Sequence, residues 1–195
     1  MTKFILPFLL FAFALHSQDM KLPYHQIPDY PADYSAGNVA ARMIDGLGYR
    51  YYWATEGLTA KDLNYKPSED ARTMLETLQH LYGLSLTIVN APQNKVNIRP
   101  MDFTLFSFEE LREKTLVNLE KASALTNGKT AEDLKGFKVI FQRGENQSEF
   151  PYWNMLNGPI ADAIYHTGQL VVFRRASGNP VNAGMNVFIG KTKEN

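Results

Sequence analysis

Residues 159–176 read PIADAIYHTGQLVVFRRA, and this segment decides the fold. Its apolar spacing predicts a helix, because Pro159 suits a first helical turn and Gly178-Asn179-Pro180 suits a stop. At about 100° per residue, the apolar side chains spread around most of the circumference. We therefore expect this helix to be the last of the fold and to be largely buried.

Three polar side chains interrupt the apolar helix on one narrow stripe: Asp162, His166 and Gln169. Buried polar groups are costly unless they are hydrogen-bonded, so three on one stripe imply a partner across a helix interface. A metal ion bound by Asp162 and His166 is one such partner. A structural hydrogen-bond network is the other, and the spacing alone leaves both open.

Three more segments show helical periodicity: residues 35–55, 68–90 and 107–125. Ser68 is expected to cap the second, because Glu69 and Asp70 follow where the helix dipole favours anions. Ser107 and Glu110 have the spacing of a capping box, which predicts the start of the third.

The segments between the predicted helices suggest one long connection and one hairpin. Alternating residues on both sides of the turn sequence RGEN (143–146) predict a two-stranded hairpin over residues 137–153, with Pro151 on an edge strand. Residues 91–106 are long enough for a crossover. The predicted fold is all-α: a four-helix bundle with a long crossover connection and a small β-hairpin before the last helix.

The second predicted helix carries a possible counterpart to the polar stripe. Glu76 and His80 are four residues apart, which places them together on the more polar side of the helix. On this pattern alone, a solvated surface histidine is favoured over a metal ligand. Glu76 is likewise favoured as a solvated residue, although it could orient His80 or act as a base.

The N-terminus resembles a signal peptide. Lys3 precedes an apolar run from Phe4 to Leu15, which is followed by the small residue Ser17. The run is well short of the ~20 residues that span a bilayer, so no stable membrane span is expected. We expect residues 1–17 to be removed and residues 18–195 to form a single domain exported to the periplasm or the extracellular space.

Composition narrows the classes of partner. The chain has 20 basic and 20 acidic residues, so no broad positive surface is expected to bind nucleic acid. It has no cysteine, which excludes disulfides and thiolate metal sites and leaves stability to a packed core. A small molecule is the expected ligand.

Two short segments resemble the signature segments of the DinB superfamily of metal-binding four-helix bundles. They are LQHL (78–81) and DAIYHTGQ (162–169), the latter followed by Arg174, Arg175 and Gly178. In that family a histidine on the second helix joins two histidines four apart on the last helix. His80 and His166 match directly, and Asp162 replaces the first histidine of the pair.

The resemblance implies a metal site formed by His80, Asp162 and His166, with Gln169 in support and coordination positions left open. Two imidazoles and one carboxylate suit a divalent ion such as Zn, Ni, Mn or Fe. Some relatives are thiol transferases or isomerases, and many are described as metal-dependent hydrolases without a known substrate. Relatives often form dimers, so a homodimer is one expectation.

Three classes of function stay open at this point. The first is a metal-dependent hydrolase or transferase acting on an unknown small molecule. The second is a metal-binding or ligand-binding protein without turnover, because no unmistakable pair of nucleophile and base is present. The third is an interaction module whose polar stripe only fixes helix register.

Overall fold

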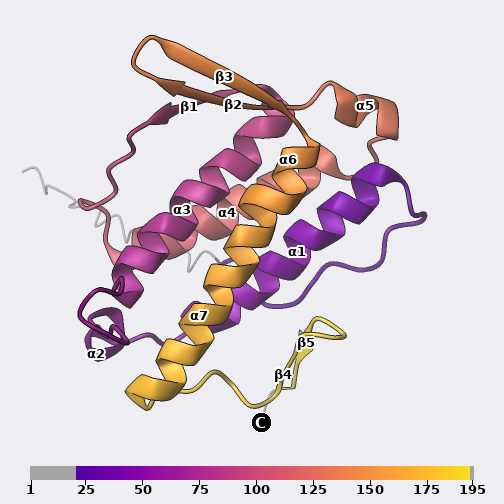
Figure 1. The fold of residues 1–195 in the computed structure, drawn as a ribbon. Coiled ribbons are helices and arrows are strands. Elements are labelled where there is room, and N and C mark those ends of the chain that lie inside the picture. The colour runs from indigo at the N-terminus through magenta and orange to yellow at the C-terminus, as the bar shows by residue number, and fades with distance from the viewer. Residues whose placement is uncertain (1–20, 194–195) are drawn as a thin grey trace, which may run out of the picture.

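Four long helices form the framework of the protein, and short helices and strands connect them (Figure 1). The computed structural model describes residues 21–193, so the predicted signal peptide lies outside the described residues. The long helices are α1 (Ala36–Thr55), α3 (Met74–Asn90), α4 (Phe108–Thr126) and α7 (Ala161–Ser177). Within residues 21–193, no helix combines the length and the apolar character needed to cross a bilayer.

The long helices share one apolar core. α1 and α3 each pack against both α4 and α7, so every long helix has two neighbours (Figure 1). Burying an aliphatic side chain contributes about 1.5–3 kcal/mol, and this core stabilises a chain without cysteines. Its fully buried members include Ile44, Leu47, Tyr51, Met74, Leu78, Leu81, Ile88, Leu111, Leu116, Leu119 and Leu170.

Local capping explains where the helices begin. Ser35 caps α1, and Ser107 with Glu110 forms the predicted box at the start of α4. Two short helices, α2 (Ala60–Leu63) and α5 (Ala131–Lys135), begin with boxes of the same kind. The side chain of each N-cap residue and that of the third helical residue satisfy backbone N–H groups that the helix leaves free.

The predicted start of the second long helix is wrong. α3 begins at Met74 and not at Ser68, because Thr73 and Glu76 form a complete reciprocal box there. Ser68 is followed three residues later by Ala71, which has no side chain that could complete a box. Instead the backbone turns, with the Ala71 N–H donating to the Ser68 carbonyl at 3.2 Å.

The hairpin is present, but it belongs to a larger sheet than predicted. Strands β2 (Lys138–Arg143) and β3 (Asn146–Pro151) pair antiparallel around the turn at 144–145. The crossover contributes a third strand, β1 (Val96–Arg99), which pairs with β2 in parallel. The buried side chain of Asn97 strengthens this pairing, because it donates to the Ile140 carbonyl at 2.9 Å.

The start and the burial of the last helix differ from expectation. A short helix, α6 (Trp153–Met155), and a π turn (Leu156–Ile160) precede α7, and the backbone kinks at Gly158. Pro159 lies inside the π turn and not at the first position of α7. The expectation that α7 is largely buried is wrong: Tyr165 is 66% exposed and Val172 58%. α7 packs against α1 and α3 on one side, which leaves its other side in solvent.

The C-terminal segment completes the described chain. Gly178 ends α7 in the left-handed conformation at φ 92°, which glycine adopts without steric cost. Strands β4 (Met185–Asn186) and β5 (Lys191–Thr192) then form a second, two-stranded sheet beside α1 (Figure 1). The protein is therefore mostly helical with two small sheets.

Candidate metal centre

The three predicted ligands come together where α3 and α7 pack. His80 lies in the second turn of α3, and Asp162 and His166 lie one turn apart at the start of α7. The Asp162 carboxylate lies between the two imidazoles. Its Oδ2 is 3.3 Å from Nε2 of His80, and its Oδ1 is 3.3 Å from Nε2 of His166.

The donor atoms are close enough to share one ion. One ligand atom from each of His80, Asp162 and His166 can be chosen so that all three lie within 4.8 Å of one another. The two imidazole rings meet nearly edge to face, with centroids 4.6 Å apart. All three residues are half-buried, so the cluster is held by packing and is still open to solvent on one side.

Gln169 fixes the orientation of one imidazole. Its Oε1 lies 2.8 Å from Nδ1 of His166, one turn further along α7. Because an amide oxygen only accepts, Nδ1 carries the proton and donates, which leaves Nε2, the nitrogen that faces Asp162, as the atom that can bind a metal. Outer hydrogen-bond partners of this kind orient metal-ligating histidines.

The surroundings of His80 keep its imidazole neutral. Burial lowers the pKa of His80, and electrostatic interactions with His166 and Arg72 lower it further, against the opposing effect of Asp162. A neutral imidazole has the lone pair that a metal requires. The electrostatics of the site therefore suit metal binding at neutral pH.

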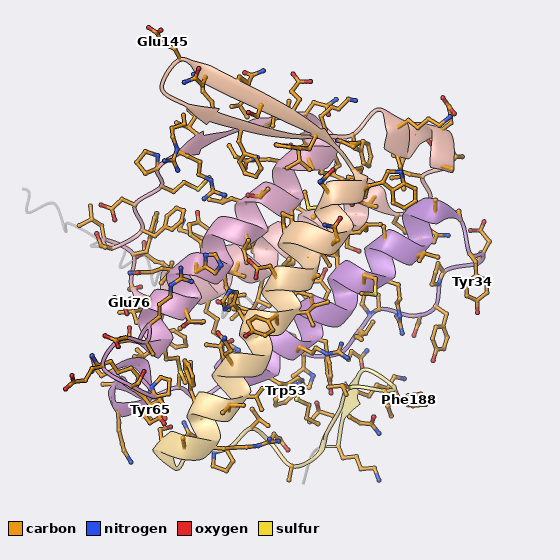
Figure 2. The ribbon with its side chains drawn as sticks, in the orientation of Figure 1. Tyr34, Trp53, Tyr65, Glu76, Glu145 and Phe188 are labelled. Atoms are coloured by element: carbon orange, nitrogen blue, oxygen red, sulfur yellow. The ribbon has the colours of Figure 1, made fainter. Side chains whose placement is uncertain are left out.

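Glu76 is placed differently from the three ligands. Its Oε2 accepts from the backbone N–H of Thr73 at 2.7 Å and from the Thr73 hydroxyl at 3.0 Å, and these hydrogen bonds lower the pKa of Glu76. Figure 2 shows it on the outside of the first turn of α3. The structure thus gives Glu76 a capping role, and its predicted action on His80 or as a base stays a prediction.

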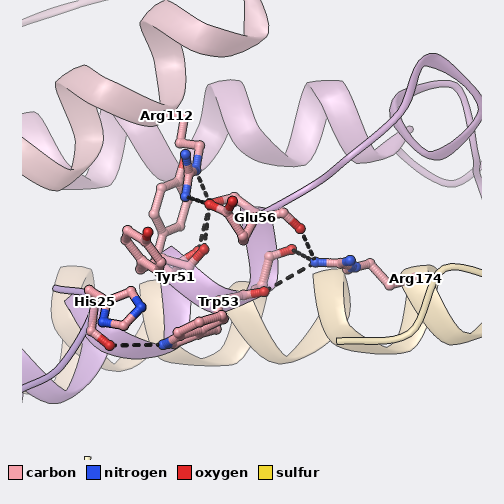
Figure 3. Close-up of polar contacts among 9 residues, drawn as sticks. His25, Tyr51, Trp53, Glu56, Arg112 and Arg174 are labelled. Atoms are coloured by element: carbon pink, nitrogen blue, oxygen red, sulfur yellow. Dashed lines mark hydrogen bonds and ion pairs between the residues drawn. The ribbon is translucent and has the colours of Figure 1, made fainter. Parts of the chain in front are cut away.

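A buried arginine of α7, Arg174, holds this helix against the end of α1. Its Nη1 donates to the carbonyls of Trp53 at 3.1 Å and Glu56 at 2.7 Å (Figure 3). Arg112 of α4 contacts Glu56 at the same corner. These contacts fix the position of α7 relative to α1, and α7 carries two of the three candidate ligands.

A second buried charge joins the same end of α7 to α2. The carboxylate of Asp62 accepts from the side chains of Ser177, Asn179 and Thr59. Burial raises the pKa of Asp62, but these hydrogen bonds outweigh burial and hold it well below its usual range. No pattern in the sequence signalled this cluster, because its members come from segments more than 100 residues apart.

A groove beside His80 was also not predicted. It has a volume of about 280 Å³ and lies between α3 and residues 99–104 of the crossover. Its charged lining residues are Arg72, Glu76, Arg99 and Asp102. The crossover segment shows no helical or strand periodicity, so its position against α3 could not be predicted from the sequence.

Comparison with known proteins identifies a structural relative. No family model and no curated protein matches this sequence. A DinB-like protein (YjoA) from Bacillus subtilis, known from its crystal structure, matches with a TM-score of 0.50 and 17% identity. The match covers 70% of this chain and 92% of that one. The likeness shows that this chain has a DinB-like fold, in agreement with the resemblance seen in the sequence.

Proposed function

We propose that this DinB-like chain is a four-helix bundle that binds one divalent metal ion through His80, Asp162 and His166. The observation that supports the proposal is the convergence of the three donor groups within 4.8 Å, from two helices. His80 and Asp162 are 82 residues apart in sequence, so only the packing of α3 on α7 brings them together.

The donor set fits a divalent ion that is intermediate between hard and soft. Two imidazole nitrogens and one carboxylate oxygen are ligands used by Zn, Ni, Mn and Fe, and the chain has no thiolate to favour softer ions. Three protein ligands leave coordination positions for a substrate group. A bound ion supplies Lewis acidity, which polarises an oxygen or sulfur group next to it.

We propose a hydrolase or transferase acting on a small molecule, with the residues of the chain in separate roles. Gln169 keeps His166 in the binding tautomer, and Asp162 holds both imidazoles toward one point. Glu76 lines the groove beside His80 and is the residue we propose as a base if its cap opens. We further propose export, with residues 18–195 as the mature domain; N-terminal sequencing of the secreted protein tests this.

One observation favours a second function. Asp162 lies 3.3 Å from Nε2 of both imidazoles and forms a hydrogen bond with His80, so the side chains satisfy part of each other's hydrogen-bonding capacity. A polar network of this kind can fix the register of two helices. The alternative is therefore a binding or interaction module without catalysis.

Metal analysis separates the two functions. The purified protein is reconstituted in turn with Zn, Ni, Mn and Fe, dialysed, and measured by elemental analysis beside Asp162→Ala and His166→Ala. His25→Gln is the matched control, because it removes one imidazole at a distance from the site. We expect near-stoichiometric metal in the parent and in His25→Gln, and little in the two site variants.

The opposite result is equally informative. If the parent takes up no metal while the site variants are less stable than the parent, the cluster is a structural network and the enzymatic proposal fails. Circular dichroism of each variant confirms that loss of metal does not reflect loss of folding.

A further inference from the structure

The groove beside His80 adjoins the candidate metal centre, because His80 belongs to both. One wall is formed by Arg72, just before α3, and by α3 from Glu76 to Leu84; the other is the crossover from Arg99 to Thr104. Figure 1 shows this crossover running beside α3 on the side away from α1. A volume of about 280 Å³ accommodates a small organic molecule.

Arg99 is a cation that the fold keeps half-buried without an acidic partner. Its Nη2 donates to the Thr87 hydroxyl at 3.2 Å, and its guanidinium lies 5.4 Å from the centre of the Phe141 ring. Within the described residues it forms no ion pair. Burial lowers the pKa of Arg99, and the like charge of Arg143 lowers it further. Most of its five N–H donors are therefore left for another acceptor.

The two carboxylates of the groove do not neutralise Arg99. Glu76 is engaged by Thr73 in the cap of α3. Asp102 accepts from the backbone N–H of Thr104 at 2.9 Å and from its hydroxyl at 2.8 Å. Both carboxylates are exposed and accept hydrogen bonds within their own turns. The positive charge of the half-buried Arg99 therefore stays available to bind an anion.

Gly83 shows how close Arg99 lies to the metal centre. A Cβ built on Gly83 would be 3.8 Å from Nη1 of Arg99, so the guanidinium rests against α3 at this position. Gly83 is three residues after His80, which corresponds to a rise of about 4.5 Å along the helix. Nη2 of Arg99 reaches Thr87, four residues further along, so the guanidinium lies about one to two helical turns beyond His80.

We infer that Arg99 binds the anionic end of the substrate, a carboxylate or a phosphate, and so directs the rest of the molecule to the metal centre. The guanidinium fork suits both groups, which accept two parallel hydrogen bonds. Arg72, at the other end of the groove, adds a second positive charge. The part of the inference that brings the substrate to the metal centre rests on the proposed function. The anion site itself rests on Arg99 alone.

Calorimetric titration of the metal-free protein tests the anion site without requiring metal or turnover. Succinate and inorganic phosphate are the two probes, and they distinguish a carboxylate from a phosphate site. The variants are Arg99→Met, which keeps the apolar stem, and Arg99→Lys, which keeps the charge but loses the fork. Arg143→Gln is the matched control. Arg143 is opposite Arg99 in the β1–β2 register, and its substitution removes one positive charge from outside the groove.

We expect at least one probe to bind the parent, with affinity at least tenfold weaker in Arg99→Met, intermediate in Arg99→Lys, and within twofold of the parent in Arg143→Gln. The inference is overturned if neither probe binds, if Arg99→Met binds as well as the parent, or if Arg143→Gln loses as much affinity as Arg99→Met. Metal uptake is measured separately, so a protein that binds the probe but no metal refutes the metal centre and keeps the anion site.

Discussion

At the scale of single residues, His80 shows what a pattern within one helix cannot decide. Its spacing places it on the polar side of α3, and that side usually faces water. Here the polar side faces the polar stripe of α7, so His80 is half-buried next to Asp162. Periodicity predicts which residues share a face, but the partner of that face depends on a helix 80 residues away.

Gln169 is expected to matter for metal affinity and not for stability. Gln169→Leu removes the acceptor that holds the Nδ1 proton of His166, so we expect metal binding about 10–100-fold weaker, the usual cost of losing such a partner. Competition with a chromophoric chelator measures the change. Gln169→Glu restores an acceptor and should recover affinity, whereas Gln147→Leu on exposed β3 should change nothing. Equal affinity in Gln169→Leu would refute the orienting role.

We expect Glu76 to contribute to stability by capping the start of α3. Because the hydrogen bonds from Thr73 lower its pKa, the charged carboxylate stabilises the fold above pH ~4, and this contribution is lost as the pH falls further. We expect Glu76→Gln to lower the melting temperature at pH 7 and to leave metal affinity unchanged. Glu110→Gln removes the equivalent group of the α4 box far from the site and should behave alike. A loss of metal affinity in Glu76→Gln alone would assign it the predicted role at His80.

At the scale of elements, local signals predicted most boundaries. Ser107 caps α4 as expected, since a cap depends on residues only three positions apart, and α1 matches the predicted segment 35–55. The start of α3 was misplaced because Thr73 offers a complete box that competes with Ser68. β1 was missed because its parallel partner β2 lies more than 40 residues further along the chain. Non-local pairing leaves no short-range pattern.

We expect replacement of the buried Arg174 to lower the stability of the fold more than replacement of an exposed arginine. It is 4% exposed and its guanidinium donates to carbonyls at the end of α1 and in the loop after α7. Arg174→Met leaves those acceptors unpaired, so we expect the free energy of unfolding to fall by about 3 kcal/mol or more. Urea denaturation measures this. Arg175→Met, the exposed neighbour, should stay within about 0.5 kcal/mol, and equal effects would contradict the capping role.

Asp62 is expected to give the fold a dependence on acid pH. Its pKa is lowered in the folded state, so its contribution is present above the unfolded value near 3.9 and is lost as the pH falls below it. Asp62→Asn should cost roughly 1–3 kcal/mol at pH 7, and the difference from the parent should shrink below pH ~4. Chemical denaturation at several pH values checks this. Asp133→Asn, in the exposed box of α5, is the control, and a pH-independent loss in Asp62→Asn would contradict the assignment.

At the scale of the whole molecule, helical periodicity predicted a four-helix bundle, and the resemblance to a known family added the complete metal site. The DinB-like fold is shown by the structural relative. Asp162 and His166 were paired by their i, i+4 positions, and His80 was added only through the resemblance. The groove and Arg99 depend on how the crossover lies against α3, which no local pattern encodes.

Metal binding is expected to stabilise the whole domain. Because the ligands come from two helices, an ion that binds only the folded state raises stability by about 2.7 kcal/mol at a free concentration 100 times Kd. For a domain of this size that corresponds to an increase of roughly 5–10 °C in melting temperature. Calorimetry with and without metal measures it. His166→Ala should show no shift, and an equal shift in that variant would indicate binding elsewhere.

The metal ligands lie on helices and the facing wall of the groove lies on the crossover, and this separation has a consequence for how the protein can change. The three donor groups lie on α3 and α7, whose positions are fixed by the core, whereas the facing wall of the groove is a connecting segment with few core contacts. Insertions and substitutions in residues 99–104 can therefore reshape the groove while the donors stay in place. Under the proposed function, a change in the crossover would alter which molecule the groove accepts and would leave the three metal ligands unchanged.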